Sequence, residues 1–249
     1  MRTLILCAAL LAPAAAFAAG GQHTLEARVS FEGRTYRQSL RLTEGRQASF
    51  VGPTGGKAMI LNALLASGGD GYRLQYQLEL SGGRGAQGRS LQLQSEAALR
   101  PGEQLETLAC GPWKVALTLD PGARPEAGAP APNYRLTADA DAAGARQVCA
   151  LLSLAGTQSN VVDGTRQGDR RFGFILNALF SRDGGGWRLQ YQLEQHPPGS
   201  PAPFSLQNEE PLALGRKTEL SGEGYRLALL LEGPARGAPK KKSGVAPAR

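Results

Sequence analysis

Apolar and polar residues alternate with a period of two through most of the chain. In residues 25–31 the apolar positions alternate with Glu26, Arg28 and Ser30, and similar runs occur at 36–42, 72–80 and 113–119. This period is typical of a β-strand with one buried face. The run 59–66 is more continuously apolar, and we expect a strand buried on both sides there. No run shows the spacing of an amphipathic helix, so the pattern predicts an all-β fold.

The chain contains an internal duplication. The segment Ile60–Leu64 recurs as Ile175–Leu179, and the segment Arg73–Glu79 recurs as Arg188–Glu194, in both cases 115 residues later. A repeated segment implies a repeated structural unit. Because two sheets can bury their apolar faces against each other, the fold class that we predict is two tandem, internally duplicated β-sandwich domains of immunoglobulin-like size.

The composition along the chain predicts the domain boundaries. The first residues resemble a signal peptide, with Arg2, an apolar stretch at 4–15 and the small-residue site Ala16-Phe17-Ala18. The apolar stretch is shorter than the roughly 20 residues of a membrane-spanning helix. We therefore expect an exported protein, either periplasmic or secreted. The expected order is a signal peptide (1–18), the first sandwich (19–120), a linker rich in proline, alanine and glycine (121–133), the second sandwich (134–232) and a disordered basic tail (233–249).

The cysteines change this picture by linking the two copies. The chain has three cysteines, and cleavage of the signal peptide removes Cys7. In an oxidising compartment the remaining two, Cys110 and Cys149, suggest one disulfide. Cys110 closes the first copy and Cys149 opens the second, so the bond would join the copies. The alternative is two separately buried thiols.

The charge is concentrated at the C-terminus. The formal net charge is +7, from 28 basic and 21 acidic residues. One basic residue lies in the signal peptide and five lie in the tail, including Lys240, Lys241 and Lys242, so the body is almost neutral. A nucleic-acid-binding domain shows a clustered basic face, and we expect none here. The tail is a candidate for weak contact with anionic polymers or lipids.

The sequence offers no catalytic, metal-binding or cofactor-binding pattern. The chain has two histidines, His23 and His196, which we expect to be exposed near loops. Neither stands in a nucleophile–base pattern, and the paired short ligand spacings of a zinc site are missing. We therefore expect no enzyme activity and no cofactor. An alternative interpretation is a hydrolase that uses loop carboxylates such as Glu209 and Glu210.

The candidate binding surface comes from the duplicated strand. Its apolar positions need only packing to explain their repetition, but its polar positions repeat without change. These polar positions, called here the Arg-Gln-Gln-Glu set, are Arg73, Gln75, Gln77 and Glu79 in copy one and Arg188, Gln190, Gln192 and Glu194 in copy two. If a two-fold axis relates the copies and these strands meet, Arg73 faces Glu194 and Arg188 faces Glu79. Such a stripe would be an interdomain or homotypic interface. Residual similarity on an ordinary solvated face is the other interpretation.

The order of turns and strands in copy one resembles the secretin domain of bacterial outer-membrane secretion channels. The resemblance rests on a glycine turn before an alanine-containing strand, Gly45–Gly52, and on a later strand that follows Pro101-Gly102-Glu103. It implies an accessory role in outer-membrane secretion machinery.

From these observations we expect an exported, non-enzymatic binding or assembly module of the cell envelope. Its partner would be a protein or another envelope component. A secreted enzyme inhibitor, which would present the loop Ser81–Arg89 or the loop Pro197–Pro203, remains a third interpretation.

Overall fold

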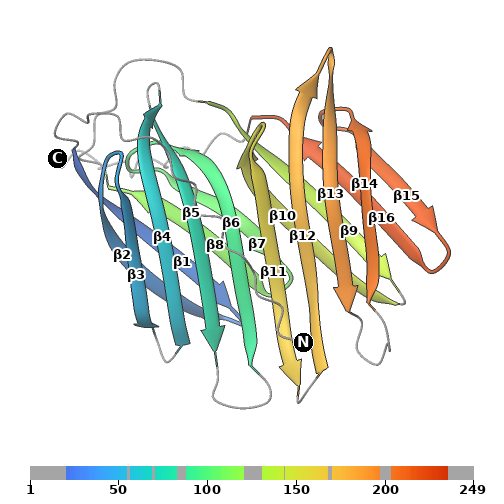
Figure 1. Ribbon diagram of the computed structural model, residues 1–249, viewed down its shortest axis with the longest axis horizontal. Helices are drawn as coiled ribbons and strands as arrows, with labels where there is room; N and C mark the ends of the chain where they lie inside the picture. The colour runs from blue at the N-terminus through green and yellow to red at the C-terminus, as the bar shows by residue number, and fades with distance from the viewer. Residues whose placement is uncertain are drawn as a thin grey trace, which may run out of the picture.

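The computed structural model describes residues 21–54, 57–68, 71–82, 88–120, 131–142, 144–167, 170–196 and 203–234. They form two eight-stranded antiparallel sheets, A and B, which face each other as two layers (Figure 1). Sheet A contains β1 (Gln22–Phe31), β2 (Arg34–Thr43), β7 (Gln104–Cys110), β8 (Trp113–Leu119), β9 (Asn133–Ala142), β10 (Ala145–Leu154), β15 (Lys217–Gly222) and β16 (Tyr225–Glu232). Sheet B contains β3 (Gln47–Thr54), β4 (Lys57–Gly68), β5 (Gly71–Gly82), β6 (Arg89–Leu99), β11 (Gln158–Gln167), β12 (Arg170–Asp183), β13 (Gly186–His196) and β14 (Phe204–Leu212).

The predicted all-β fold with duplicated sandwich units is confirmed. No helix in the described ranges is long and apolar enough to cross a membrane.

Each copy is a meander of eight strands. In copy one, β1 and β2 lie in sheet A, the next four strands in sheet B, and β7 and β8 return to sheet A, where β8 pairs with β1. Copy two repeats this path from β9 to β16. A glycine begins the crossing from sheet A to sheet B in each copy. Gly45 and Gly156 have positive φ, and their amides donate to Leu65 O at 2.7 Å and Phe180 O at 2.8 Å. Glycine adopts this conformation without steric cost, which keeps both corners alike.

The two copies share both sheets. The strand order is β15-β16-β9-β10-β7-β8-β1-β2 in sheet A and β14-β13-β12-β11-β6-β5-β4-β3 in sheet B. Copy two therefore joins copy one through β10–β7 and β11–β6. We call this region the junction. It is a head-to-tail arrangement, because the β10/β11 side of copy two meets the β6/β7 side of copy one.

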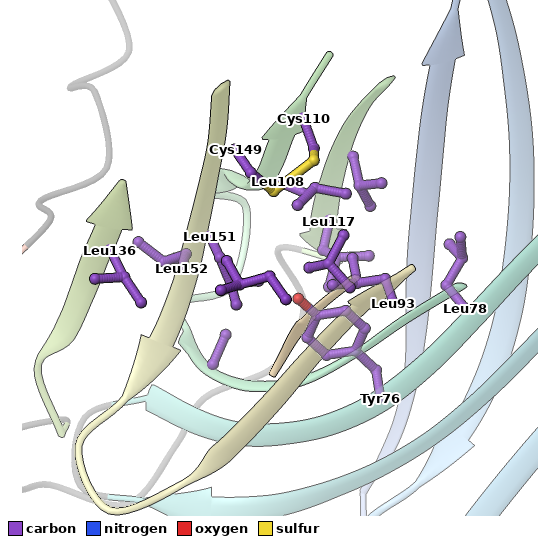
Figure 2. Packing of buried hydrophobic residues seen from close by; sticks show 14 of the residues in the cluster. Tyr76, Leu78, Leu93, Leu108, Cys110, Leu117, Leu136, Cys149, Leu151 and Leu152 are labelled. Carbon is purple, nitrogen blue, oxygen red and sulfur yellow. A yellow bond between two sulfur atoms is a disulfide. The ribbon is translucent and has the colours of Figure 1, made fainter. Parts of the chain in front are cut away.

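The core runs continuously through the junction. The inward side chains of both copies form one buried cluster. Figure 2 shows Leu151 of copy two among Leu93, Leu108 and Tyr76 of copy one. The expectation of a strand buried on both sides at 59–66 is wrong. Burial in β4 alternates, because sheet A covers only one side of sheet B and leaves the other side to solvent.

Candidate functional site

The Arg-Gln-Gln-Glu set lies on the outer face of sheet B. In β5 and β13 the aromatic and leucine side chains between the set's members point into the core and are buried. Exposure along the set follows the same order in both copies: the arginine and first glutamine are exposed, and the second glutamine and glutamate are half-buried. Both halves of the set therefore face solvent on one continuous surface.

The two duplicated strands do not meet within the chain. Strands β6, β11 and β12 lie between β5 and β13. The expected pairs of Arg73 with Glu194 and of Arg188 with Glu79 are therefore not formed. Their geometry required a two-fold relation between the copies, whereas the copies join head to tail. Arg73 instead forms an ion pair with Glu96.

A row of polar side chains crosses the whole outer face of sheet B. The pairing register places one residue from each strand directly opposite the next, and all but one are amides. In spatial order these residues, called here the amide row, are Ser49, Asn62, Gln77, Gln94, Asn160, Asn177, Gln192 and Gln207. Asn62 donates to Gln77 Oε1 at 3.4 Å, and Asn177 donates to Gln192 Oε1 at 3.1 Å. The junction does not interrupt the row, because Gln94 of copy one faces Asn160 of copy two.

A second set of contacts repeats beside the amide row. Gln75 donates to Glu96 Oε2 at 3.4 Å in copy one, and Gln190 donates to Glu209 Oε2 at 2.9 Å in copy two. The same carboxylates form ion pairs with Arg73 and Arg188 respectively. On the other side of the row, Gln77 donates to Glu79 Oε1 at 2.9 Å and Gln192 donates to Glu194 Oε1 at 2.8 Å. Each copy thus presents the same two adjacent groups of contacts, one of an arginine, a glutamine and a carboxylate, and one of two amides and a carboxylate. The two groups together are called here the network of that copy.

The repeat of 115 residues does not reveal the carboxylates that bind Arg73 and Arg188. Glu96 and Glu209 follow Gln94 and Gln207 by two residues, so a short Gln-x-Glu pattern recurs. Its spacing is 113 residues instead of 115, because the loops before β6 and β14 differ in length. A search that allowed the offset to change along the chain would have detected it.

Electrostatics keep the copy-two network charged. Glu209 accepts hydrogen bonds from Arg188 and from Gln190, and these lower the pKa of its carboxyl below the ordinary value. The bond from Arg188 has the larger effect. The bonds with Glu209 and Asp183 raise the pKa of Arg188. Glu210 points to the opposite face of β14, because neighbouring residues in a strand alternate. Glu209 and Glu210 therefore do not converge on one site.

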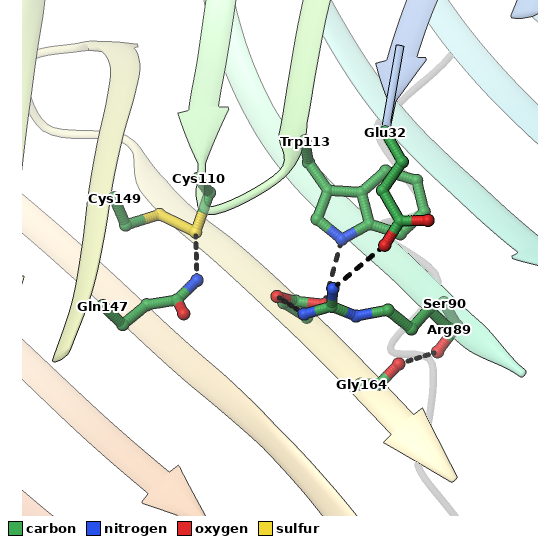
Figure 3. Close-up of polar contacts among 9 residues, drawn as sticks. Glu32, Arg89, Ser90, Cys110, Trp113, Gln147, Cys149 and Gly164 are labelled. Atoms are coloured by element: carbon green, nitrogen blue, oxygen red, sulfur yellow. Dashed lines mark hydrogen bonds and ion pairs between the residues drawn. A yellow bond between two sulfur atoms is a disulfide. The ribbon is translucent and has the colours of Figure 1, made fainter. Parts of the chain in front are cut away.

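The junction carries a second group of polar contacts (Figure 3). The indole of Trp113 in copy one donates to Asp163 Oδ1 in copy two at 2.9 Å, and Arg89 lies 3.6 Å from the same carboxylate. Burial raises the pKa of Asp163, and the Trp113 hydrogen bond and the Arg89 charge partly oppose this shift. Asn133, at the start of β9, links this strand to β6. Its side chain accepts a hydrogen bond from Ala98 N and donates one to Ala98 O, both at 2.8 Å.

The predicted disulfide is present. Cys110 and Cys149 face each other across β7 and β10, with their Cα atoms 4.0 Å apart, and are bonded. The bond therefore joins the copies, as the sequence indicated, and Gln147 donates to Cys110 Sγ at 3.7 Å (Figure 3).

The remaining predicted residues have different outcomes. His23 is buried against the ring of Tyr72, so the expectation that it is exposed is wrong. It occupies the inward position at the start of β1, which the Tyr72 ring covers. The described ranges contain no group of three or more His, Cys, Asp or Glu side chains able to hold a metal ion. Several predicted features lie outside the described residues: the expected signal peptide (1–18), Lys240–Lys242, residues 121–130 of the expected linker, and most of the two proposed inhibitor loops.

Comparisons of the chain with protein-family models, with curated proteins and with solved structures find no match. They add nothing to the secretin resemblance of copy one. Support for a function of this protein therefore comes from the geometry of its two sheets.

Proposed function

We propose that the protein is an exported, non-enzymatic binding or assembly module of the cell envelope. In this proposal the outer face of sheet B, centred on the amide row, is its recognition surface. The partner is a polar protein surface or another hydrogen-bonding envelope component.

The observation that carries the proposal is a contrast between the two outer faces. Both faces come from the same duplication and both meet solvent. On sheet A most of the corresponding outward residues have diverged, for example Arg28 and Asp139, or Arg37 and Val148, although Glu106 recurs as Glu219. On sheet B the networks around Gln77 and Gln192 have kept the same side chains. A solvated face does not need identity for stability, so its retention supports recognition.

The chemistry of the face suits an extended polar partner. A carboxamide both donates and accepts hydrogen bonds, so the row can pair with peptide groups or with hydroxyl groups. Bonds between neighbouring side chains hold these groups in place before binding, which lowers the entropy cost of ordering them. Gln77 and Gln192 are four strand spacings apart, or about 19 Å. A partner with repeated polar groups can therefore engage both networks at once.

Two further features support export. A disulfide persists in oxidising compartments outside the cytosol, and here it joins the two copies. The beginning of the sequence has the features of a signal peptide. The basic tail adds a second, weaker contact in this proposal, through attraction of Lys240, Lys241 and Lys242 to anionic polymers or lipids.

The test compares two double variants of the chain from residue 19. Gln77→Ala with Gln192→Ala removes the central amide of each network. Lys114→Ala with Arg226→Ala is the matched control, because these exposed residues occupy corresponding positions on the outer face of sheet A. Each immobilised protein is incubated with an envelope extract, and the affinity of the retained component is then measured.

The wild type and the sheet A control should retain the same component. The glutamine variant should bind it roughly thirtyfold more weakly, since each lost hydrogen bond contributes about 1 kcal/mol. Equal retention by all three folded proteins would show that sheet B is not the recognition surface.

A further inference from the structure

The strands at the two ends of the sandwich correspond to the strands that form the junction between the copies. One end, called here the leading edge, consists of β2 and β3. The other, the trailing edge, consists of β14 and β15. In copy two the counterparts of β2 and β3 are β10 and β11, and in copy one the counterparts of β14 and β15 are β6 and β7. The leading and trailing edges are thus the two halves of a second junction.

The core is incompletely covered at these two edges. The partly buried apolar side chains that pack on the core are Ala48, Phe50, Phe204, Leu206, Leu220 and Tyr225. All of them lie on the edge strands or on the adjoining β16. Their counterparts at the junction are buried: Val161 corresponds to Phe50, Leu93 to Leu206 and Leu108 to Leu220. The junction closes the apolar layer that the edges leave open.

On the outer face, the exposure of Val51 also indicates that a neighbouring strand is missing at the leading edge. Val51 is 74% exposed in β3, the most exposed large apolar side chain among the described residues. Its counterpart Val162 is half-buried, because β11 is paired with β6 and Val162 lies opposite Gln92. The difference between these two valines comes from the missing neighbouring strand.

We propose that a second copy of this chain docks head to tail, with its leading edge on the trailing edge of the first. The occupant is another copy because the interface already exists between the repeats. This kind of contact does not close on itself, so it generates an open series of oligomers.

The register of the junction sets the register of the proposed contact. At the junction Ala150 lies opposite Ala109. The corresponding edge residues are Ser39 and Ser221, which are both exposed. Two residues further along, the same register brings Arg41 of one chain opposite Glu219 of the next.

Charge is complementary in this register. Strand β2 contains Arg34, Arg37 and Arg41 and no acidic residue. The trailing edge contains three acidic residues and one basic residue, Lys217, which forms an ion pair with Glu219. In sheet B, Ser49 of the second chain would lie beside Gln207 of the first. The amide row would then continue from one chain to the next, which lengthens the face described above.

Some features of the junction are absent from the two edges. Their absence makes the proposed contact between chains weaker than the junction within a chain. Gln38 and Gly222 stand where the junction has its two bonded cysteines. Pro53 stands at the position of Gly164, and proline cannot donate a ladder hydrogen bond. The association is therefore non-covalent, shorter in sheet B than the junction ladder, and dependent on concentration.

Cross-linking decides between head-to-tail docking and other contacts. Two variants, each with one added cysteine, Ser39→Cys and Ser221→Cys, are mixed under mild oxidation. The proposed register should give a covalent heterodimer at least tenfold more efficiently than a mixture of Ser221→Cys with Lys114→Cys, whose added thiol lies on a central strand. Equal yields in the two mixtures would overturn the proposal.

Charge reversal tests the same contact by sedimentation velocity. The average mass of the chain from residue 19 should rise with concentration beyond that of a dimer. Arg41→Glu and Glu219→Arg should each weaken association by roughly tenfold. The two changes in one chain should restore it, and Lys114→Glu should have no effect. A mass that stops at the dimer, or a double variant as weak as the singles, would contradict head-to-tail docking. Because these residues lie outside the amide row, the result is independent of the proposed recognition face.

Discussion

At the scale of single residues, Asp163 is the acidic side chain at the junction whose environment opposes its ionisation. It is 3% exposed, and its carboxylate accepts from the Trp113 indole and lies near the Arg89 guanidinium. These contacts lower the cost of the buried charge without cancelling it, so its pKa remains raised. An acid of this kind makes folding depend on pH in the direction opposite to that of a surface ion pair.

Asp163→Asn should therefore gain stability relative to the wild type as the pH rises from acid to neutral. Since the folded-state pKa lies above the unfolded value of 3.8, the favourable contribution of Asp163 is complete below that value. It is lost as the pH rises through the folded-state pKa. The asparagine keeps an acceptor for Trp113 and does not ionise. Urea unfolding of both proteins across this pH range measures the difference.

Asp139→Asn is a control of opposite sign. The hydrogen bond from Arg146 lowers the pKa of Asp139, so this group stabilises the fold above its unfolded pKa and loses that effect as the pH falls. The Asp139 variant should be weakest relative to the wild type at neutral pH. If the free energies of the Asp163 variant and the wild type stayed parallel at every pH, the assigned electrostatic role of Asp163 would be wrong.

At the scale of elements, the alternation of residues predicted the strands far better than their partners. Residues 25–31 and 113–119 were predicted as strands from a period of two, and they are β1 and β8. Alternation within a strand is set by which face is buried, so a local pattern is enough to reveal it. The expectation of two buried faces for β4 failed because Ile60 and Leu64 are apolar residues on a solvent face.

Register across strands could not be read from the sequence. The amide row needs strands from both copies to align, and the copies keep different spacings: 111 residues from Ser49 to Asn160, but 115 from Asn62 to Asn177. Loop lengths absorb these differences. The pairing of β6 with β11 produces no recognisable pattern in the sequence of either strand. The cysteines were the one sequence feature that connected the two sides of the junction.

The disulfide should be the main support of the shorter half of the junction. Strands β7 and β10 pair over only Leu108–Cys110 and Cys149–Leu151. Closing a loop with a sequence separation of 39 contributes about 4 kcal/mol through the entropy of the unfolded chain. Cys110→Ser with Cys149→Ser should lower the free energy of unfolding by about that amount, as measured by urea denaturation. Adding reductant to the wild type should reproduce the loss, and to the variant should change nothing. An unchanged midpoint in the variant would mean that the strands hold the junction without the bond.

At the scale of the whole molecule, the duplication gives two repeats but a single core. The inward side chains of both copies belong to one cluster, and both sheets run through the junction. Buried polar contacts add to this continuity, since Ser95 in β6 bonds with Ser159 in β11 at 2.8 Å. Separating the copies would expose apolar surface and break the hydrogen bonds of Ser95 with Ser159 and with Leu152 O. Neither copy can therefore unfold without a large cost to the other.

We expect the two copies to unfold in one transition, and the tryptophans allow each copy to be followed alone. The chain has two tryptophans, Trp113 in copy one and Trp187 in copy two. Trp187→Phe leaves a reporter in the first copy, and Trp113→Phe leaves one in the second. Within each variant, the fluorescence midpoint in urea should coincide with the midpoint of far-ultraviolet circular dichroism, because a shared core makes the transition all-or-none. The comparison within one variant removes the effect of the substitution itself, which for Trp113 includes the lost bond to Asp163. A fluorescence midpoint displaced from the circular dichroism midpoint in either variant would show that the copies unfold as independent domains.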